Sequence, residues 1–556
     1  MTVQQLITDH LDIWTTAHKA RSSAGRGASN KLDIYGIKKL RELILELAVR
    51  GKLAPQDSND EPASELLKKI AAEKERRLEE GKIKKVKVSS AITNQAQLYQ
   101  LPTGWCWSRY GDIVDISTGK LDANAQVIGG QYPFFTCSQT PSEIDNYAFD
   151  CDAILLAGNG DFNLKYYSGK FNAYQRTYVI EPILIDLKFL YYLTCSEIDQ
   201  ITKNNRGSAI SYLKINDITS PMIAIPPYPE QHRIVAKVDE LMAFCDQLEQ
   251  TQSDNIAAHA QLVEALLATL TNSSDHNELQ NNWQRIAAHF DTLFTTEHSI
   301  DQLKQTILQL AVMGKLVPQN PNDEPASELL KKIAAEKAQL IKEGKIKNHP
   351  PVEPMGDQIF LPDGWIEVVV QDFADVRLGS TPSRTETKYW DGDILWVSSG
   401  EVANCIITDT AEKITKEGFA NSSTSMIPAR SLLMAIIGQG KTRGQTALLG
   451  VEACTNQNVA AFVFNENFVV PEFVWLWARS KYESHRGDGR GGAQPALNGK
   501  IVRSFRFPLP PFEEQQRIVA KVDELMALCD ALQTNLQNVQ TTQLALADAL
   551  VEQVVL

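Results

Sequence analysis

The sequence predicts an α+β fold in which two globular domains are separated by long helices. Blocks with helical periodicity occur twice along the chain, in the same order each time. The two segments between these blocks differ from one another, yet both contain short β-branched and aromatic runs bounded by Gly, Asn and Pro, as strands are. The length of 556 residues leaves room for several hydrophobic cores. We therefore expect a repeated helical frame that carries two different sheet domains.

The first repeated block, called block A, lies at about residues 31–95 and again at about residues 295–350. Its central string NDEPASELLKKIAAEK occurs unchanged at residues 59–74 and 322–337, an offset of 263 residues. Block A is interpreted as two helices, the second of which is charged and has most of its lysines in solvent. The first helix is predicted from an apolar stripe of Leu40, Leu43 and Leu47, and it is expected to end at Gly51 and Pro55. The second helix is predicted from about Pro62 to Glu80.

The second repeated block, called block B, lies at about residues 226–270 and again at about residues 509–556. Between residues 230–248 and 514–532, 16 of 19 positions are identical. The Pro and Glu that open the first copy suit the first turn of a helix. The apolar residues that follow alternate by four and three, which is the seam of a coiled coil: Ile234, Val238, Leu241, Cys245 and Leu248, and then Ile518, Val522, Leu525, Cys529 and Leu532.

The two unique segments open alike, with LPTGW and LPDGW, and then diverge. Runs such as DAILLAG, RTYVIEP, DILWVSS and NVAAFVF predict their strands. The predicted division begins with an N-terminal helical region (residues 1–99), a first sheet domain (100–225) and a central helical region (226–359). A second sheet domain (360–508) follows, and then a C-terminal helix (509–556) that pairs with the N-terminal region.

Composition limits the possible functions. The formal net charge of −13 argues against a protein that coats DNA through phosphate contacts, so a nucleic-acid role requires locally basic stretches or a partner that supplies positive charge. The eight cysteines form no C-x-x-C pair, which favours reduced thiols in a cytoplasmic protein over a disulfide scaffold or a zinc site. The N-terminus is polar, and no apolar run approaches the roughly 18 residues of a membrane span.

The strings IPPYP, from Ile225, and LPPF, from Leu509, are close to the active-site signature of enzymes that methylate exocyclic amino groups of DNA bases. Those enzymes place Asp, Asn or Ser before the two prolines, as an acceptor for the target amino group. Ile225 and Leu509 cannot accept a hydrogen bond, and no glycine-rich turn with an acidic partner is present for an adenosine cofactor. The two prolines are interpreted as the end of a strand and the start of a helix, and no catalytic or metal-binding residue is predicted.

Three pairs of strings carry a resemblance to a known family. They are GKLAPQDSNDEPASELLKKIAAEK and GKLVPQNPNDEPASELLKKIAAEK, LPTGW and LPDGW, and PPYPEQHRIVAKVDELM and PPFEEQQRIVAKVDELM. These strings are long and occur twice in the order found in specificity subunits of type I restriction–modification systems. The sequence resembles that family over nearly its whole length.

The resemblance implies that two target-recognition domains each read one half of a gapped DNA target. Conserved helices, packed antiparallel as a coiled-coil spacer, would set the spacing between the halves. The subunit itself is expected to be non-catalytic, and to act in DNA methylation and phage defence. Its expected partners are double-stranded DNA, two adenine-N6 methyltransferase subunits and motor/nuclease subunits. No cofactor is expected in this chain, whereas the methyltransferase partner is expected to use S-adenosylmethionine.

The order of the blocks then implies a circularly permuted repeat. The central B and A blocks adjoin in sequence, whereas the terminal A and B blocks must meet in space. If the terminal A and B blocks pack together, the molecule has a pseudo-two-fold axis, and the two recognition domains meet DNA in opposite orientations. A helix of about 40 residues spans roughly 60 Å, which corresponds to one to two turns of DNA at about 34–36 Å each.

Base-reading residues are predicted in polar, glycine-flanked loops, because Arg matches the guanine edge and Asn or Gln the adenine edge. Local basic stretches are expected to contact phosphates. An ordinary loop or strand role stays open for each candidate. In the first sheet domain the predicted DNA-binding residues are Lys120, Asn124, Asn159, Lys165, Tyr174, Gln175, Arg176 and Arg206. In the second they are Thr381, Arg384, Lys441, Arg443, Gln457, Arg490, Gln494 and Asn498.

Three alternatives stay open on sequence alone. The chain could be a methyltransferase with its own recognition domains, although the missing polar residue and cofactor loop argue against this. It could be the specificity subunit of a system that methylates without a nuclease. It could also be a coiled-coil adaptor with no DNA role, although an adaptor has little use for two divergent globular domains. The string SSAGRGASN, Ser22 to Asn30, is interpreted as a flexible loop or as a DNA or partner contact.

Overall fold

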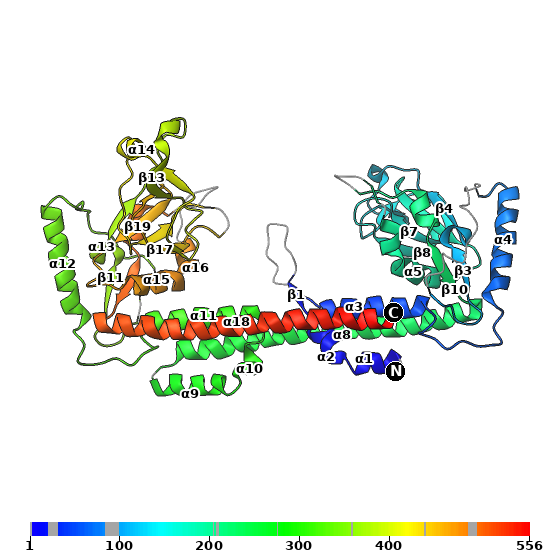
Figure 1. The fold of residues 1–556 in the computed structure, drawn as a ribbon, viewed down its shortest axis with the longest axis horizontal. Coiled ribbons are helices and arrows are strands. Elements are labelled where there is room, and N and C mark those ends of the chain that lie inside the picture. Colours follow the sequence, from blue (N-terminus) through cyan, green and yellow to red (C-terminus); the bar gives the residue numbers. More distant parts are fainter. Residues whose placement is uncertain are drawn as a thin grey trace. The chain divides into compact units, whose positions relative to one another are not determined.

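The computed structural model describes residues 3–20, 32–83, 99–203, 205–206, 211–274, 276–356, 358, 360–438, 441–487 and 497–555. Its contacts divide the chain into two compact units, Met1–Ile256 with Asn538–Leu556, and Ala257–Gln537. Each unit contains one sheet domain and one set of frame helices (Figure 1). The predicted α+β class is confirmed, whereas the division into five regions stays a prediction.

The frame of the first unit is helical, as predicted for blocks A and B. Apolar residues at helical spacing along α3 and the start of α8 are buried together in the core of this unit, including Leu40, Leu43, Ile234 and Val238. Gly51 ends α3 in a left-handed conformation with φ +67, and a Cβ there would lie 2.5 Å from Pro102 Cγ. The frame helices are α1 (Val3–Thr8), α2 (Leu11–Thr16), α3 (Tyr35–Val49), α4 (Ala63–Glu79), the first part of α8 (Tyr228–Asn272) and the last part of α18 (Phe512–Val555), with the short strands β1 (Lys19–Ala20) and β2 (Leu32–Asp33).

Helices α3 and α8 run antiparallel in the first unit. Arg41 on α3 donates to Glu249 on α8 at 2.9 Å, whereas Gln56, which follows α3, donates to Glu230 at the start of α8 at 3.3 Å. The end of α18 joins the same core, because Ala547 is fully buried in it and the Tyr35 hydroxyl donates to Asp548 at 2.7 Å. The two ends of the sequence therefore contribute to one packed unit.

A buried joint fixes the first sheet domain to this frame. The indole N–H of Trp105, in the LPTGW string, donates to the Glu230 carboxylate at 3.0 Å, and Glu230 is 1% exposed. Arg233 donates to Asp60 at 2.6 Å, and Gln231 accepts from the backbone N–H of Asp186 at 3.0 Å. Block A, block B and the sheet domain thus meet at the first turn of α8.

The first sheet domain contains a six-stranded sheet in the order β4-β9-β7-β8-β5-β6 and a two-stranded sheet of β10 and β3. The predicted strands DAILLAG and RTYVIEP lie in β7 and β9, which are antiparallel neighbours. The strands are β3 (Cys106–Arg109), β4 (Val114–Thr118), β5 (Tyr132–Phe135), β6 (Ser142–Ile144), β7 (Phe149–Ala157), β8 (Leu164–Ala173), β9 (Thr177–Pro182) and β10 (Met222–Ile225). The helices of the domain are α5 (Leu187–Ser196), α6 (Ile198–Thr202) and α7 (Ile215–Thr219).

The second unit repeats this construction with its own residues. Trp365 donates to Glu514 at 3.0 Å, Gln319 donates to the same carboxylate at 3.2 Å, and Arg517 donates to Asp323 at 2.6 Å. The frame helices are the second part of α8, α9 (His276–Ala287), α10 (Phe290–Leu293), α11 (Glu297–Val312), α12 (Ala326–Lys342) and the first part of α18. The predicted seam residues of the second block B, Ile518, Val522 and Cys529, are buried in the core of this unit.

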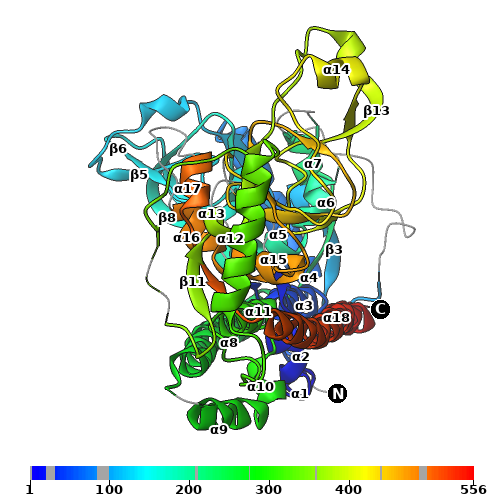
Figure 2. The same ribbon diagram turned by 90° about the vertical axis from the view of Figure 1, so that its left-hand side faces the viewer.

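The second sheet domain has a five-stranded sheet, β12-β19-β16-β17-β14, a three-stranded sheet, β15-β13-β18, and a two-stranded sheet of β11 and β20. Figures 1 and 2 show β13 and α14 at the end of this domain farthest from α11. The strands are β11 (Ile366–Val369), β12 (Asp375–Leu378), β13 (Trp390–Val397), β14 (Ile406–Ile407), β15 (Glu412–Ile414), β16 (Leu432–Ala435), β17 (Thr446–Leu449), β18 (Cys454–Thr455), β19 (Val459–Val463) and β20 (Arg506–Leu509). The helices are α13 (Val370–Phe373), α14 (Lys416–Ala420), α15 (Pro471–Ser480), α16 (Tyr482–Gly487) and α17 (Gly499–Arg503).

Candidate functional site

The turn between β8 and β9 collects several predicted DNA-binding residues of the first sheet domain. Gln175 and Arg176 are exposed at this turn, whose flanking residues Ala173 and Thr177 are buried. The backbone N–H of Thr177 donates to Tyr174 O at 2.8 Å and closes the turn. Two consecutive polar side chains therefore stand on a short segment that is fixed at both ends by buried strand residues.

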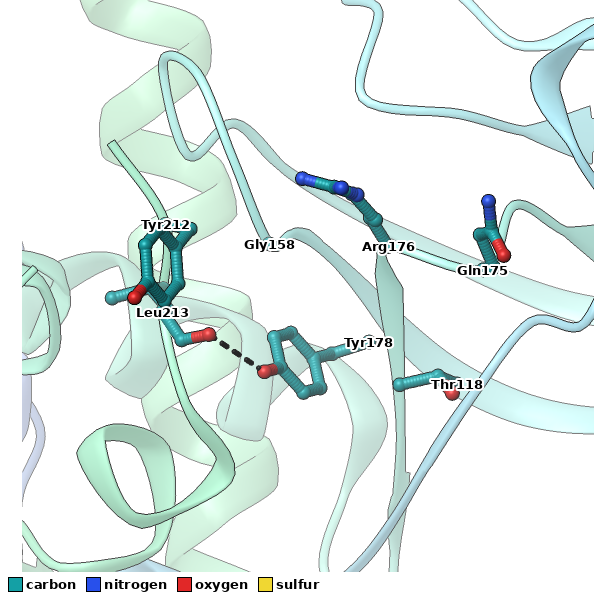
Figure 3. Close-up of a pocket in the computed structure, with 7 residues that line it drawn as sticks. All are labelled: Thr118, Gly158, Gln175, Arg176, Tyr178, Tyr212 and Leu213. Carbon is teal, nitrogen blue, oxygen red and sulfur yellow. Dashed lines mark hydrogen bonds between the residues drawn. The ribbon is translucent and has the colours of Figure 1, made fainter. Parts of the chain in front are cut away.

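A cavity of about 400 Å³ lies beside this turn (Figure 3). It is lined by Thr118, Gly158, Gln175, Arg176, Tyr178, Tyr212 and Leu213. The Tyr178 hydroxyl donates to Leu213 O at 3.0 Å, which ties β9 to the segment before α7. Tyr212 is 39% exposed, so an aromatic face is available next to an arginine and an amide. Thr118 and Tyr212 were not predicted: Thr118 is the last residue of β4, and the bridges that bring Tyr212 beside Asn159 and Arg206 have no local sequence signal.

Other predicted residues of the first domain are placed around the same cavity or near it. Leu121, next to Lys120, forms a bridge with Tyr174, and Asn159 forms a bridge with Tyr212. Lys120 and Asn124 are exposed, and Asn124 N donates to Asp122 Oδ1 at 3.2 Å. These backbone pairings bring Lys120 and Asn159 toward the turn at residues 174–177.

Two predicted cations of the first domain already have partners. Arg206 pairs with Asp217 at 2.7 Å, and Lys165 donates to Asn163. Burial lowers the pKa of Lys165, which is only partly exposed. Arg206 would have to leave its carboxylate to contact DNA, whereas Arg176 has no acidic partner within the described residues.

In the second sheet domain, Gln457 and Thr381 lie together. The Thr381 hydroxyl donates to the Gln457 side-chain oxygen, and Gln457 is exposed on the turn that leads into β19. Arg384 pairs with Glu412, stacks on Trp390 with its guanidinium 3.9 Å from the ring centroid, and lies 5.2 Å from that of Trp396. That arrangement holds the Arg384 guanidinium in place within the domain.

The remaining predictions divide into three groups. Asn498 caps α17, since its side chain accepts from the backbone N–H groups of Lys500 and Ile501 at 3.0 Å. Lys441 is exposed, and its carbonyl accepts from the Tyr482 hydroxyl at 2.6 Å, while Arg443 is only partly exposed. Arg490 and Gln494, like Ser22–Asn30, lie outside the described residues.

The Pro-Pro strings occupy strand-to-helix junctions, as interpreted from sequence. Ile225 is fully buried at the end of β10, opposite Cys106, and α8 begins at Tyr228. Leu509 is likewise fully buried at the end of β20, and α18 begins at Phe512. The side chain before each proline pair is therefore part of a core.

Comparison with known proteins decides the family. A family model described as "Type I restriction modification DNA specificity domain" matches residues 102–258 and 362–540. The chain is 39% identical to the type I restriction enzyme EcoAI specificity subunit of Escherichia coli, with 99% of each chain covered. The chain belongs to the family of type I restriction–modification specificity subunits. It is also 36% identical to the EcoEI specificity subunit of Escherichia coli, again over 99% of each chain.

Among solved structures, one described as the structural basis underlying complex assembly and conformational transition of the type I R-M system aligns with a TM-score of 0.49 and 18% identity, covering 82% of this chain and 99% of that chain. Family membership makes this chain the DNA-specificity component of a multisubunit system, not its catalytic component. Its partners are accordingly DNA and other restriction–modification subunits.

Over the described ranges, none of the helices is both long enough and apolar enough to cross a membrane. Within the same ranges, no three His, Cys, Asp or Glu side chains are grouped as a metal site.

Proposed function

We propose that each sheet domain of this specificity subunit reads one half of a bipartite, gapped DNA target. The observation that carries this proposal is the repetition of one joint around two different domains. Trp105 with Glu230, and Trp365 with Glu514, make the same 3.0 Å hydrogen bond, although the two sheets differ in strand number and order. A constant frame that holds two variable domains suits two independent recognition events.

The frame helices are proposed to set the distance between the two half-sites. They are also proposed to dock two adenine-N6 methyltransferase subunits and, through these, motor/nuclease subunits. Two copies of the frame provide two equivalent docking surfaces, which favours two methyltransferase subunits for each chain. In this proposal S-adenosylmethionine is bound by the methyltransferase, and the complex acts on DNA in the cytoplasm.

The negative charge of the chain is consistent with assembly on DNA through partners. With a net charge of −13, the isolated subunit has a weak electrostatic attraction to phosphates. Local basic stretches would fix the register of each sheet domain on the duplex, and the methyltransferase subunits would supply most of the phosphate contacts. We therefore expect the isolated chain to bind DNA much more weakly than the chain with its methyltransferase.

The proposal is tested by mapping N6-methyladenine. The chain and its methyltransferase partner are expressed in a host that lacks adenine methylation, and the genome is sequenced for modified adenines. The expected result is one gapped motif with two defined halves. A continuous motif would contradict the reading of two half-sites, and the absence of any motif would contradict the proposed function as a whole. Restriction of unmodified phage DNA on adding the nuclease subunit would distinguish full restriction from methylation alone.

A further inference from the structure

The two sheet domains contain the same turn in the same hydrogen-bond frame, although their sequences diverge. In the first domain, Thr177 N donates to Tyr174 O at 2.8 Å, and in the second, Val459 N donates to Asn456 O at 3.3 Å. The strands that enter these turns have matching parallel partners, since Phe135 faces Ala173 and Val397 faces Thr455.

The strands that leave the two turns also have the same register. In the first domain Val179 of β9 faces Ser117 of β4 and Leu155 of β7. In the second domain Ala461 of β19 occupies the corresponding position, facing Arg377 of β12 and Leu433 of β16. In both domains, the strand that leaves the turn is therefore the middle one of three antiparallel strands.

Further contacts fix the correspondence at single residues. Gly158 N donates to Arg176 O at 2.8 Å, and Ile436 N donates to Asn458 O at 2.8 Å. Leu213 N donates to Gly158 O at 3.0 Å, and Leu497 N donates to Ile436 O at 2.9 Å. These contacts make Gln175 equivalent to Gln457, and Arg176 equivalent to Asn458.

A close approach of two backbones supports the same correspondence. Gly119, after β4, and Gly379, after β12, lie so near the entering strand that a Cβ would stand 1.9 Å from Ala173 O and from Thr455 O. Only glycine fits at these positions. The close approach of the two backbones brings the loop that follows each glycine against the turn. Asp122 in one loop and Thr381 in the other then contact the equivalent glutamines, Asp122 at 3.4 Å from Gln175.

The exposed side chains at the equivalent positions have the chemistry of base readers. Gln175 and Gln457 are exposed, and each is held at one end of its amide by the neighbouring loop. Arg176 is exposed, and Asn458 is partly exposed. Within the described residues Arg176 has no acidic partner, unlike Arg206, Arg384 and Arg430, which pair with carboxylates.

We infer that this shared turn is the base-reading element of both domains, with the glutamine reading an adenine in each half-site and the next residue making the half-sites differ. This inference rests on the proposed function. A Gln or Asn amide matches the N6 and N7 edge of adenine, and the Arg guanidinium matches O6 and N7 of guanine. Arg176 thus selects guanine in the first half-site, and Asn458 selects adenine at the corresponding place in the second.

The test uses the full chain co-expressed with its methyltransferase and compares methylated motifs. Arg176→Ala is expected to make one base pair of one half-site degenerate, with about a tenfold to a hundredfold loss of discrimination there. Asn458→Ala is expected to do the same in the other half-site. In each case the untouched half-site is the internal control. Arg76→Ala, which removes an exposed arginine of α4 paired with Glu73 and Glu80, is the charge-matched control and should leave the motif unchanged.

Arg176→Lys separates base reading from phosphate contact. Lysine keeps the charge but lacks the rigid, planar fork of N–H donors, so base reading predicts relaxed selection, whereas a phosphate contact predicts an unchanged motif. An unchanged motif in Arg176→Ala, Arg176→Lys and Asn458→Ala would overturn the inference.

If a variant methylates nothing, the purified complex is titrated with duplexes changed at one base pair at a time. Loss of selectivity at one base pair supports the inference, and a uniform loss at all positions overturns it. A wild-type chain without any gapped motif would instead reject the proposed function, so the two failures are distinguishable.

Discussion

Trp105 donates its indole N–H to the buried carboxylate of Glu230 at 3.0 Å, and this bond joins the first sheet domain to the first turn of α8. Burial raises the pKa of the Glu230 carboxyl, and the hydrogen bonds from Trp105 and Gln56 act in the opposite direction. Burying an acid at the point where three segments meet is unfavourable, and the two donors together with the charge of Arg233 offset part of that cost.

Trp105→Phe should destabilise the first unit by about 1–3 kcal/mol, because an aromatic ring is kept at this position while the pyrrole part of the indole, with the donor to the buried carboxylate, is lost. Hydrogen exchange measured by mass spectrometry resolves the two units. The exchange rate of backbone amides should increase only at residues that pack around Glu230. Trp365→Phe should give the equivalent increase around Glu514 in the second unit. Unchanged exchange in both variants would show that the bond is not a stabilising joint.

Arg233→Ala should cost about 1–2 kcal/mol of unfolding free energy, because it leaves the Asp60 carboxylate, which is 9% exposed, without its partner. Lys237→Ala is the matched control. Lys237 lies one turn further along α8, is similarly exposed and pairs with Glu240, which is 64% exposed. Its replacement should change stability by less than about 0.5 kcal/mol. Equal losses in chemical denaturation would contradict the assignment of Arg233 to the joint.

Gly51→Ala should be more destabilising than Gly81→Ala, although both glycines have nearly the same left-handed conformation, φ +67 and φ +68. A Cβ at residue 81 meets nothing within 4 Å, so Gly81→Ala should lose only the conformational contribution to stability, about 1 kcal/mol. At residue 51 the Cβ would stand 2.5 Å from Pro102 Cγ and 2.9 Å from Trp105 Cζ2, which should raise the loss above about 2 kcal/mol. Thermal denaturation of the two variants under one buffer condition measures the difference.

Glu197 predicts a pH dependence of stability in the first unit. Burial and the nearby charge of Glu46 raise its pKa from 4.5 to about 7, with Arg50 opposing the shift. The folded state therefore holds this proton more tightly than the unfolded state, so the contribution of Glu197 to stability is complete below about pH 4.5 and is lost as pH rises through 7.

Glu197→Gln should remove this dependence and raise stability at pH 8 by about 1–2 kcal/mol. Asp199→Asn, on the exposed side of the adjacent helix α6, is the control for loss of one charge. Melting temperatures measured from pH 4.5 to 8 should differ in slope between the wild type and Glu197→Gln alone. Parallel curves would rule out Glu197 as the titrating group.

The frame could be predicted from sequence because its signals are local and occur twice. The stripe through Leu40 and Leu43, and the seam through Ile234 and Val238, are both buried as their spacing indicates. The Pro-Pro strings were interpretable for a similar reason, since an apolar residue before them cannot accept a hydrogen bond.

The strand orders and the candidate site were harder to predict, because both depend on contacts between distant residues. Neither the neighbourhood of β9 with β4 and β7, nor the pairing of Arg206 with Asp217, has a local sequence signal. The equivalence of Gln175 and Gln457 was hidden as well, because loops of different length separate the matching strands of the two domains.

The most direct test of the central claim exchanges one sheet domain. Residues 101–222 are replaced by the corresponding segment of a relative with a different target, and N6-methyladenine is mapped in a host that lacks adenine methylation. Two independent readers on one frame predict that one half of the gapped motif changes while the other half and the spacing persist. A motif that stays unaltered, or one that changes in both halves at once, would contradict that account.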